Sequence, residues 1–184
     1  MNFRGGAEIS NLMSANPQQK KSDQKSKKIE LSQYTKVVEF LLNGKHFVVD
    51  LHDVKEIVHC GGITKLPNTP QHIHGIIDIR GQITTVIDPK KYLNITGIQE
   101  SELGKCKIIV LDEEKAGTKV GMLVDEVVAV TTYTKDDINT SINVSSNSYI
   151  KGVMEKVHPG TRPGDPNKIE LIVWIDVSKF MEGL

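Results

Sequence analysis

One arginine stands out among the residues whose side chains could recognise another molecule. Arg80 ends a strand-like segment that begins at Gly75 and is rich in isoleucine, and it directly precedes Gly81. A planar guanidinium can make a bidentate contact with a carboxylate or with backbone carbonyl groups, and arginines are enriched among interface hot spots. The plainer alternative is a solvated surface arginine. The place of Arg80 at a hairpin tip, with Asp78 to orient it, favours recognition of a partner.

Two histidines at alternate positions, His72 and His74, would project to one side of an extended segment. With His59 and Cys60 earlier in the chain, they make a metal site conceivable. No third and fourth ligand follows at a recognised spacing. Loop histidines beside a proline turn are the simpler interpretation, so we predict no metal and no cofactor.

Catalytic motifs are absent from the sequence. It contains no GxSxG, Walker loop, GxGxxG or HExxH, and no nucleophile has an evident base partner. Aspartates that follow strands usually cap the next element. Those of this chain are Asp88, Asp125, Asp136, Asp137 and Asp176. We therefore predict that the protein is not an enzyme.

The net charge of zero conceals a difference between the tail and the rest. Residues 1–33 carry six basic and three acidic side chains, and the remaining residues carry 17 basic and 20 acidic ones. A mildly acidic folded part with 5% aromatic residues is poorly suited to nucleic acid. Small β-barrels can nevertheless bind single strands. A β-barrel single-stranded nucleic-acid-binding protein with a basic tail is therefore the alternative function.

The first 32 residues are polar and rich in Lys, Gln and Ser. Such a composition cannot bury enough apolar surface to offset the entropy of ordering, so we predict a flexible, mildly basic tail over residues 1–32. Two cysteines, Cys60 and Cys106, are too few for a disulfide framework, and we predict that both are reduced thiols. No apolar run reaches the length of a membrane span, which favours a cytoplasmic protein.

Alternating hydrophobic runs predict strands that are joined by tight turns. Asn43-Gly44 is typical of a type I′ hairpin turn. After it, the spacing of Leu51, Val54, Ile57 and Val58 predicts a short helix with Asp50 as its N-cap. In that helix Lys55 and Glu56 would point away from the buried face.

The hairpin that carries Arg80 is expected to turn at Gly81-Gln82. A type II′ turn there would pair Arg80 with Ile83, Asp78 with Thr85, and Ile76 with Ile87. The opposite face would carry Ile77, Ile79, Thr84 and Val86.

The two halves of the chain repeat a pattern. The motif I-D-x-x-K-aromatic-aliphatic begins at Ile87 and again at Ile175, and a Gly-led strand begins at Gly75 and again at Gly152. Repeats set the architecture, and short strands with little helix between them favour small antiparallel barrels. We therefore expect two similar barrels side by side, with a final short helix capped by Asp176.

Several motifs in this order resemble the CheW family of chemotaxis adaptors. They are Val54-x-Glu56-Ile57, Leu66-Pro67-Asn68-Thr69-Pro70, Gly75-x-x-x-x-Arg80-Gly81 and Ile87-Asp88. The resemblance covers about residues 33–184. It implies a mainly β fold of two tandem five-stranded SH3-like barrels with short helices, so that residues 33–184 form a CheW-like domain of two intertwined barrel subdomains.

The resemblance also implies a function. CheW-like proteins couple the cytoplasmic tips of methyl-accepting chemoreceptors to the regulatory domain of the histidine kinase CheA, and they associate with the membrane only through receptor arrays. The expected contact residues are Val54, Glu56, Gly75, Arg80, Val124, Val127 and Val130. Neither nucleic-acid binding nor membrane insertion is expected.

Overall fold

A computed structural model of the chain describes residues 34–95, 106–134, 138–139, 149–158 and 165–184. The tail predicted over residues 1–32 lies outside these ranges. The strands are β1 Tyr34–Leu42, β2 Lys45–Asp50, β3 Val54–His59, β4 Ile73–Ile79, β5 Gln82–Ile87, β6 Lys107–Leu111, β7 Val120–Val124, β8 Glu126–Thr134, β9 Ile138–Asn139, β10 Ile150–His158 and β11 Lys168–Ile175. The helices are the 3₁₀ turn η1 Leu51–Asp53, α2 Pro89–Tyr92, α3 Glu113–Ala116 and α4 Val177–Glu182.

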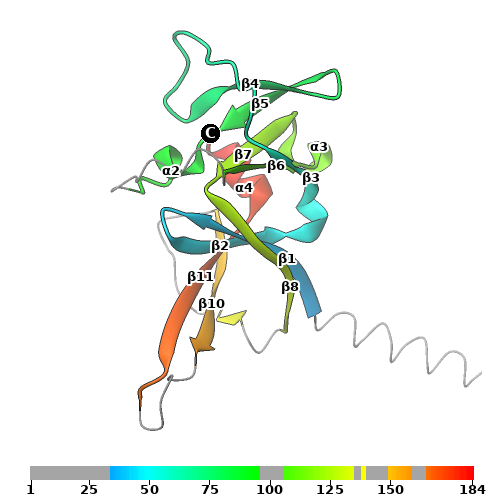
Figure 1. The fold of residues 1–184 in the computed structure, drawn as a ribbon. Coiled ribbons are helices and arrows are strands. Elements are labelled where there is room, and N and C mark those ends of the chain that lie inside the picture. Colours follow the sequence, from blue (N-terminus) through cyan, green and yellow to red (C-terminus); the bar gives the residue numbers. More distant parts are fainter. Residues whose placement is uncertain (1–33, 96–105, 135–137, 140–148, 159–164) are drawn as a thin grey trace, which may run out of the picture. The chain divides into compact units, whose positions relative to one another are not determined.

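The strands form two sheets that exchange hairpins between the halves of the chain (Figure 1). One sheet has the order β8-β1-β2-β11-β10-β9, and the other has the order β3-β6-β7-β5-β4. The hairpin β1–β2 therefore lies among strands of the second half, and β6–β7 lies among strands of the first. β2 runs parallel to β11, as β7 does to β5. Apart from β9, the two sheets have the same order, which agrees with the repeat in the sequence.

One hydrophobic core contains residues from both sheets. Phe40 of β1 and Phe47 of β2 belong to the same buried cluster as Ile109 of β6, Met122 of β7 and Phe180 of α4. Burial of large side chains is the main favourable term in folding. The two sheets therefore share a hydrophobic core.

The predicted fold class is confirmed: the structure is mainly β, with short helices. Each sheet has two edge strands that do not pair with each other, so among the described residues neither sheet closes into a complete barrel. The first sheet has a sixth strand, the two-residue β9, which has no counterpart in the other sheet.

Several local predictions are also confirmed. Leu42 pairs with Lys45 around Asn43 and Gly44, and both turn residues have positive φ. The Asp176 carboxylate accepts a hydrogen bond from the Lys179 amide at 3.1 Å and caps α4. In the other half, Asp88 caps α2, and its carboxylate accepts a hydrogen bond from the Lys90 amide at 3.1 Å.

The helix predicted after Asp50 is wrong. Only η1 is helical there, and Asp50 makes no side-chain capping bond. The following residues form β3, because they pair with β6 from Val54 opposite Leu111 to His59 opposite Lys107. Pairing with a distant strand has overridden the local helical spacing.

The register predicted for the Arg80 hairpin is also wrong. Ile79 pairs with Gln82, Asp78 with Ile83, and Ile76 with Thr85. The turn residues are therefore Arg80 and Gly81, with φ of 53° and 81°, as in a type I′ turn. Ile77 and Val86 do share a buried face with the partly buried Ile79, as predicted.

The prediction of two reduced thiols is contradicted as well. The structure joins Cys60 and Cys106 in a disulfide, with Cα atoms 5.7 Å apart. The two cysteines directly adjoin the last pair of the β3–β6 ladder, His59 and Lys107. Strand pairing therefore places their side chains within disulfide reach, which cysteine counting could not show.

Candidate partner-binding site

Glu56 and Arg80 form an ion pair between β3 and the β4–β5 turn. The distance from Arg80 Nη2 to Glu56 Oε2 is 3.0 Å. Alternation along β3 turns Glu56 to the same side as Val54 and Val58, which are also partly buried, while Lys55 and Ile57 are exposed. The Glu56 side chain is 23% exposed, whereas that of Arg80 is 83% exposed. Arg80 therefore presents most of its guanidinium to solvent.

Asp78 fixes the turn and not the arginine. Its Oδ1 accepts a hydrogen bond from the Gly81 amide at 2.7 Å. This contact stabilises a turn in which Arg80 itself has a left-handed backbone, a conformation that costs energy for a residue other than glycine. Our expectation that Asp78 orients the Arg80 side chain is corrected: the carboxylate in contact with the guanidinium is that of Glu56.

The ion pair borders a shallow hollow of about 200 Å³. Apart from the pair, its walls carry charged side chains at Lys55, Glu113 and Lys119 and apolar ones at Ile79, Val110 and Leu111. Lys55 Nζ lies 3.2 Å from Glu113 Oε1 across this hollow. A hollow that combines charged and apolar side chains is suited to a protein partner.

Two other predicted contact residues have structural roles. Val54 is partly buried and packs against the main core. Gly75 lies at a β-bulge of β4, where a Cβ atom would collide with the Thr64 carbonyl oxygen. The close approach occurs because Thr64 and Ile76 exchange two backbone hydrogen bonds of 2.8 and 2.9 Å.

The predicted contacts in the segment 124–130 lie on β7 and β8. Val124 is fully buried in the core and Val127 is partly buried against it, whereas Val130 is 56% exposed. With Val128, Val130 forms an exposed apolar pair on β8, at one end of the six-stranded sheet. Only Val130 of these three valines presents a large apolar surface, and it belongs to the other sheet from Arg80.

Between β7 and β8, Asp125 joins three parts of the chain. Lys90 Nζ of α2 lies 2.5 Å from its Oδ1, and the Asn43 amide donates to its Oδ2 at 2.5 Å. The Asp125 amide in turn donates to the Leu41 carbonyl oxygen at 3.0 Å. Sequence reasoning identified Asp125 only as a possible cap, because its partners lie 35 and 82 residues away.

The predicted histidine pair occupies two different surroundings. The ring of His72 lies edge-on to Tyr92, with centroids 6.4 Å apart. Burial lowers the pKa of His74, and the charges of three nearby lysines lower it further against the opposing effect of Asp88. The lysines are Lys65, Lys90 and Lys91. His74 therefore favours its neutral form.

Comparison with known proteins gives a consistent result. The family model for the CheW-like domain matches residues 36–183. The chemotaxis protein CheW of Bacillus subtilis (strain 168) is 30% identical over 112 residues, which are 61% of this chain and 69% of that protein. CheW of Thermotoga maritima is 24% identical over 147 residues, which are 79% of this chain and 87% of that protein.

A solved structure agrees with these relatives. The scaffolding protein TtCheW of Thermoanaerobacter tengcongensis superposes with a TM-score of 0.61 at 31% identity, over 77% of this chain and 88% of that one. The fold and these matches define the class of chemotaxis adaptor proteins. Within that class, the chain belongs to the CheW-like family, which confirms the resemblance seen in the sequence.

Among the residues that the structure describes, no helix is both long enough and apolar enough to cross a membrane.

Proposed function

We propose that this chain is a non-catalytic coupling protein that binds the regulatory domain of the histidine kinase CheA and the cytoplasmic tip of a chemoreceptor. The observation that carries the proposal is the match to the CheW-like domain over residues 36–183. The name of the solved relative, a scaffolding protein, supports an adaptor that assembles other proteins.

The proposed mechanism is mechanical. By holding the receptor tip and the kinase in fixed relative positions, the adaptor biases the conformational equilibrium of the kinase. Each single contact needs only modest affinity, because contacts in an array act together. Localisation to the cytoplasmic side of receptor arrays belongs to the same proposal.

We assign the hollow beside Arg80 to one of the two partners. The exposed guanidinium would contact a carboxylate or carbonyl groups of the partner, and Glu56 would hold it in position. Val130 and the neighbouring Val128, which are exposed on β8, would offer an apolar contact to the other partner. The remaining predicted residues, Val54, Gly75, Val124 and Val127, would act by holding these surfaces in shape.

Titration calorimetry tests the partners. The purified chain is titrated with a CheA regulatory domain and, separately, with a chemoreceptor signalling fragment from an organism that encodes this chain. We expect saturable binding of both. Failure to bind either partner would contradict the proposal.

The contact role of Arg80 is tested with a substitution. Because a hairpin-tip side chain contributes little to the core, Arg80→Ala should keep the wild-type fold and weaken binding of one partner by about tenfold or more. Lys45→Ala, which removes an exposed cation beside the other type I′ turn, is the matched control and should bind normally. Unchanged affinity in the folded Arg80→Ala protein would show that Arg80 is merely solvated.

A further inference from the structure

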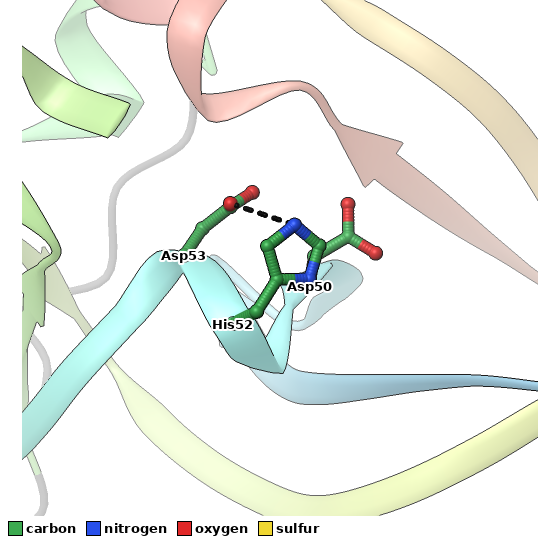
Figure 2. Close-up of side chains that lie close together, drawn as sticks. All are labelled: Asp50, His52 and Asp53. Atoms are coloured by element: carbon green, nitrogen blue, oxygen red, sulfur yellow. Dashed lines mark ion pairs between the residues drawn. The ribbon is translucent and has the colours of Figure 1, made fainter. Parts of the chain in front are cut away.

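A cluster of three possible metal ligands lies away from the Arg80 hollow, at the end of β2 and in η1. One ligand atom from each of Asp50, His52 and Asp53 lies within 4.8 Å of the other two. Figure 2 shows the imidazole between the two carboxylates, with the His52–Asp53 contact dashed. The distance from His52 Nε2 to Asp53 Oδ1 is 3.1 Å.

Local backbone structure brings these side chains together. Asp50 has an extended backbone and is followed directly by the single turn η1, which carries the other two residues. Asp50 occupies the N-cap position without making a side-chain capping bond, so its carboxylate is not used by the backbone of η1. The turn therefore gathers three potential donors within four consecutive residues.

One oxygen of the cluster lacks a partner. Asp50 is buried, and its Oδ2 accepts from Lys151 Nζ at 2.8 Å. Its Oδ1 is also buried and has no hydrogen-bond partner among the described residues. A buried carboxylate oxygen without a donor is costly. Lys151 is itself held over the Trp174 ring, 4.3 Å from the centroid, and it contacts the other oxygen.

The surroundings carry more negative than positive side chains. The cluster borders a hollow of about 370 Å³ that is also lined by Asp176, Glu182, Lys115, Lys151 and Lys179. Four carboxylates thus face three ammonium groups. Asp50 and Asp53 also lie close enough for one carboxylate oxygen of each to fall within 4.8 Å of the other. A divalent cation between them would relieve the repulsion of the two carboxylates.

We propose that Asp50, His52 and Asp53 bind one divalent transition-metal ion, and that the ion is Zn²⁺. One imidazole nitrogen and two carboxylate oxygens form a donor set that suits zinc, whereas calcium and magnesium favour oxygen alone. His52 Nε2, Asp53 and the unpartnered Oδ1 of Asp50 would be the ligands. Water from the open hollow would complete the coordination.

Metal binding to the full chain tests this site. The protein, without an affinity tag or reducing agent so that Cys60–Cys106 stays closed, is dialysed against Zn²⁺ and its metal content is measured. We expect one zinc per chain, and a parallel dialysis against Mg²⁺ should give none. His52 is 66% exposed, so His52→Ala should fold normally and bind zinc roughly tenfold or more weakly.

Two further variants complete the experiment. His59→Ala removes another exposed histidine and should retain wild-type zinc binding, whereas Asp53→Asn should lose it. Circular dichroism establishes that each variant is folded. The proposal is overturned if the wild type binds no zinc, or if folded His52→Ala binds it as tightly as the wild type does.

Discussion

The ion pair between Glu56 and Arg80 positions the arginine but leaves most of its guanidinium exposed to solvent. With 83% of its side chain exposed, Arg80 belongs to a class of surface pairs that contribute about 0–1 kcal/mol to stability. A partner carboxylate can therefore share or replace Glu56 at little cost. The same reasoning explains why removal of Arg80 should affect binding far more than folding.

Lys90, in contrast to the exposed Arg80, is a buried cation. Lys90→Ala leaves the Asp125 carboxylate without its ammonium partner, and we expect the free energy of unfolding to fall by about 3 kcal/mol. Lys91→Ala, next along the chain and exposed, is the control and should change stability little. Urea denaturation measures both, and equal midpoints for the two variants would contradict this account.

His74 predicts a contribution to the pH dependence of stability. Its folded-state pKa lies below the ordinary 6.5 because of burial, so the unfolded chain takes up a proton more readily. The contribution of His74 to the free energy of unfolding is therefore fully present above pH 6.5. It is lost as the pH falls from that value towards the lower pKa of the folded state. His74→Gln should therefore lose less stability on acidification than the wild type, as measured by urea denaturation at several pH values. Equal losses in the two proteins would contradict the shift.

Strand β3 shows that local sequence patterns are insufficient to predict the type of an element. The spacing of Leu51, Val54, Ile57 and Val58 fits a helical face, yet β3 alternates between partly buried and exposed residues. Its pairing with β6, about 50 residues later in the chain, determines the outcome. The ion pair of Glu56 with Arg80 was missed for this reason: a helix would have turned Glu56 towards solvent.

Because of the close packing at the Gly75 bulge, we expect any side chain at this position to lower the stability of the fold. In Gly75→Ala the new Cβ would meet the Thr64 carbonyl oxygen and the Ile63 side chain, so we expect destabilisation of about 2–4 kcal/mol. Gly61→Ala is the control, since its Cβ would meet nothing within 4 Å. Thermal unfolding of both variants measures the difference. A Gly75→Ala protein as stable as Gly61→Ala would show that the bulge relaxes freely.

For the whole molecule, the local elements could be predicted from the sequence, but the exchange of hairpins between the two halves of the chain could not. The Asn43-Gly44 turn, the caps at Asp88 and Asp176 and the repeat follow from local chemistry, and all appear in the structure. The placement of β1–β2 among strands of the second half could not be read from any local pattern. The same holds for Asp125, whose partners come from distant segments.

The disulfide predicts a redox-dependent stability. Cys60 and Cys106 are 46 residues apart, and a cross-link of that span restricts the unfolded chain. Cys106→Ser, or reduction of the wild type, should lower the free energy of unfolding by about 2–4 kcal/mol. Urea denaturation with and without dithiothreitol measures this. The double variant Cys60→Ser/Cys106→Ser should not respond to the reductant, and an unresponsive wild type would contradict the prediction.

Reconstitution of signalling tests the coupling role most directly. A CheA kinase and a chemoreceptor signalling fragment are mixed with and without this chain, and kinase autophosphorylation is measured as the receptor concentration rises. We predict that the receptor changes kinase activity only when the chain is present, and that Arg80→Ala weakens this dependence. Kinase activity that responds to the receptor equally well without the chain, or not at all with it, would contradict the account.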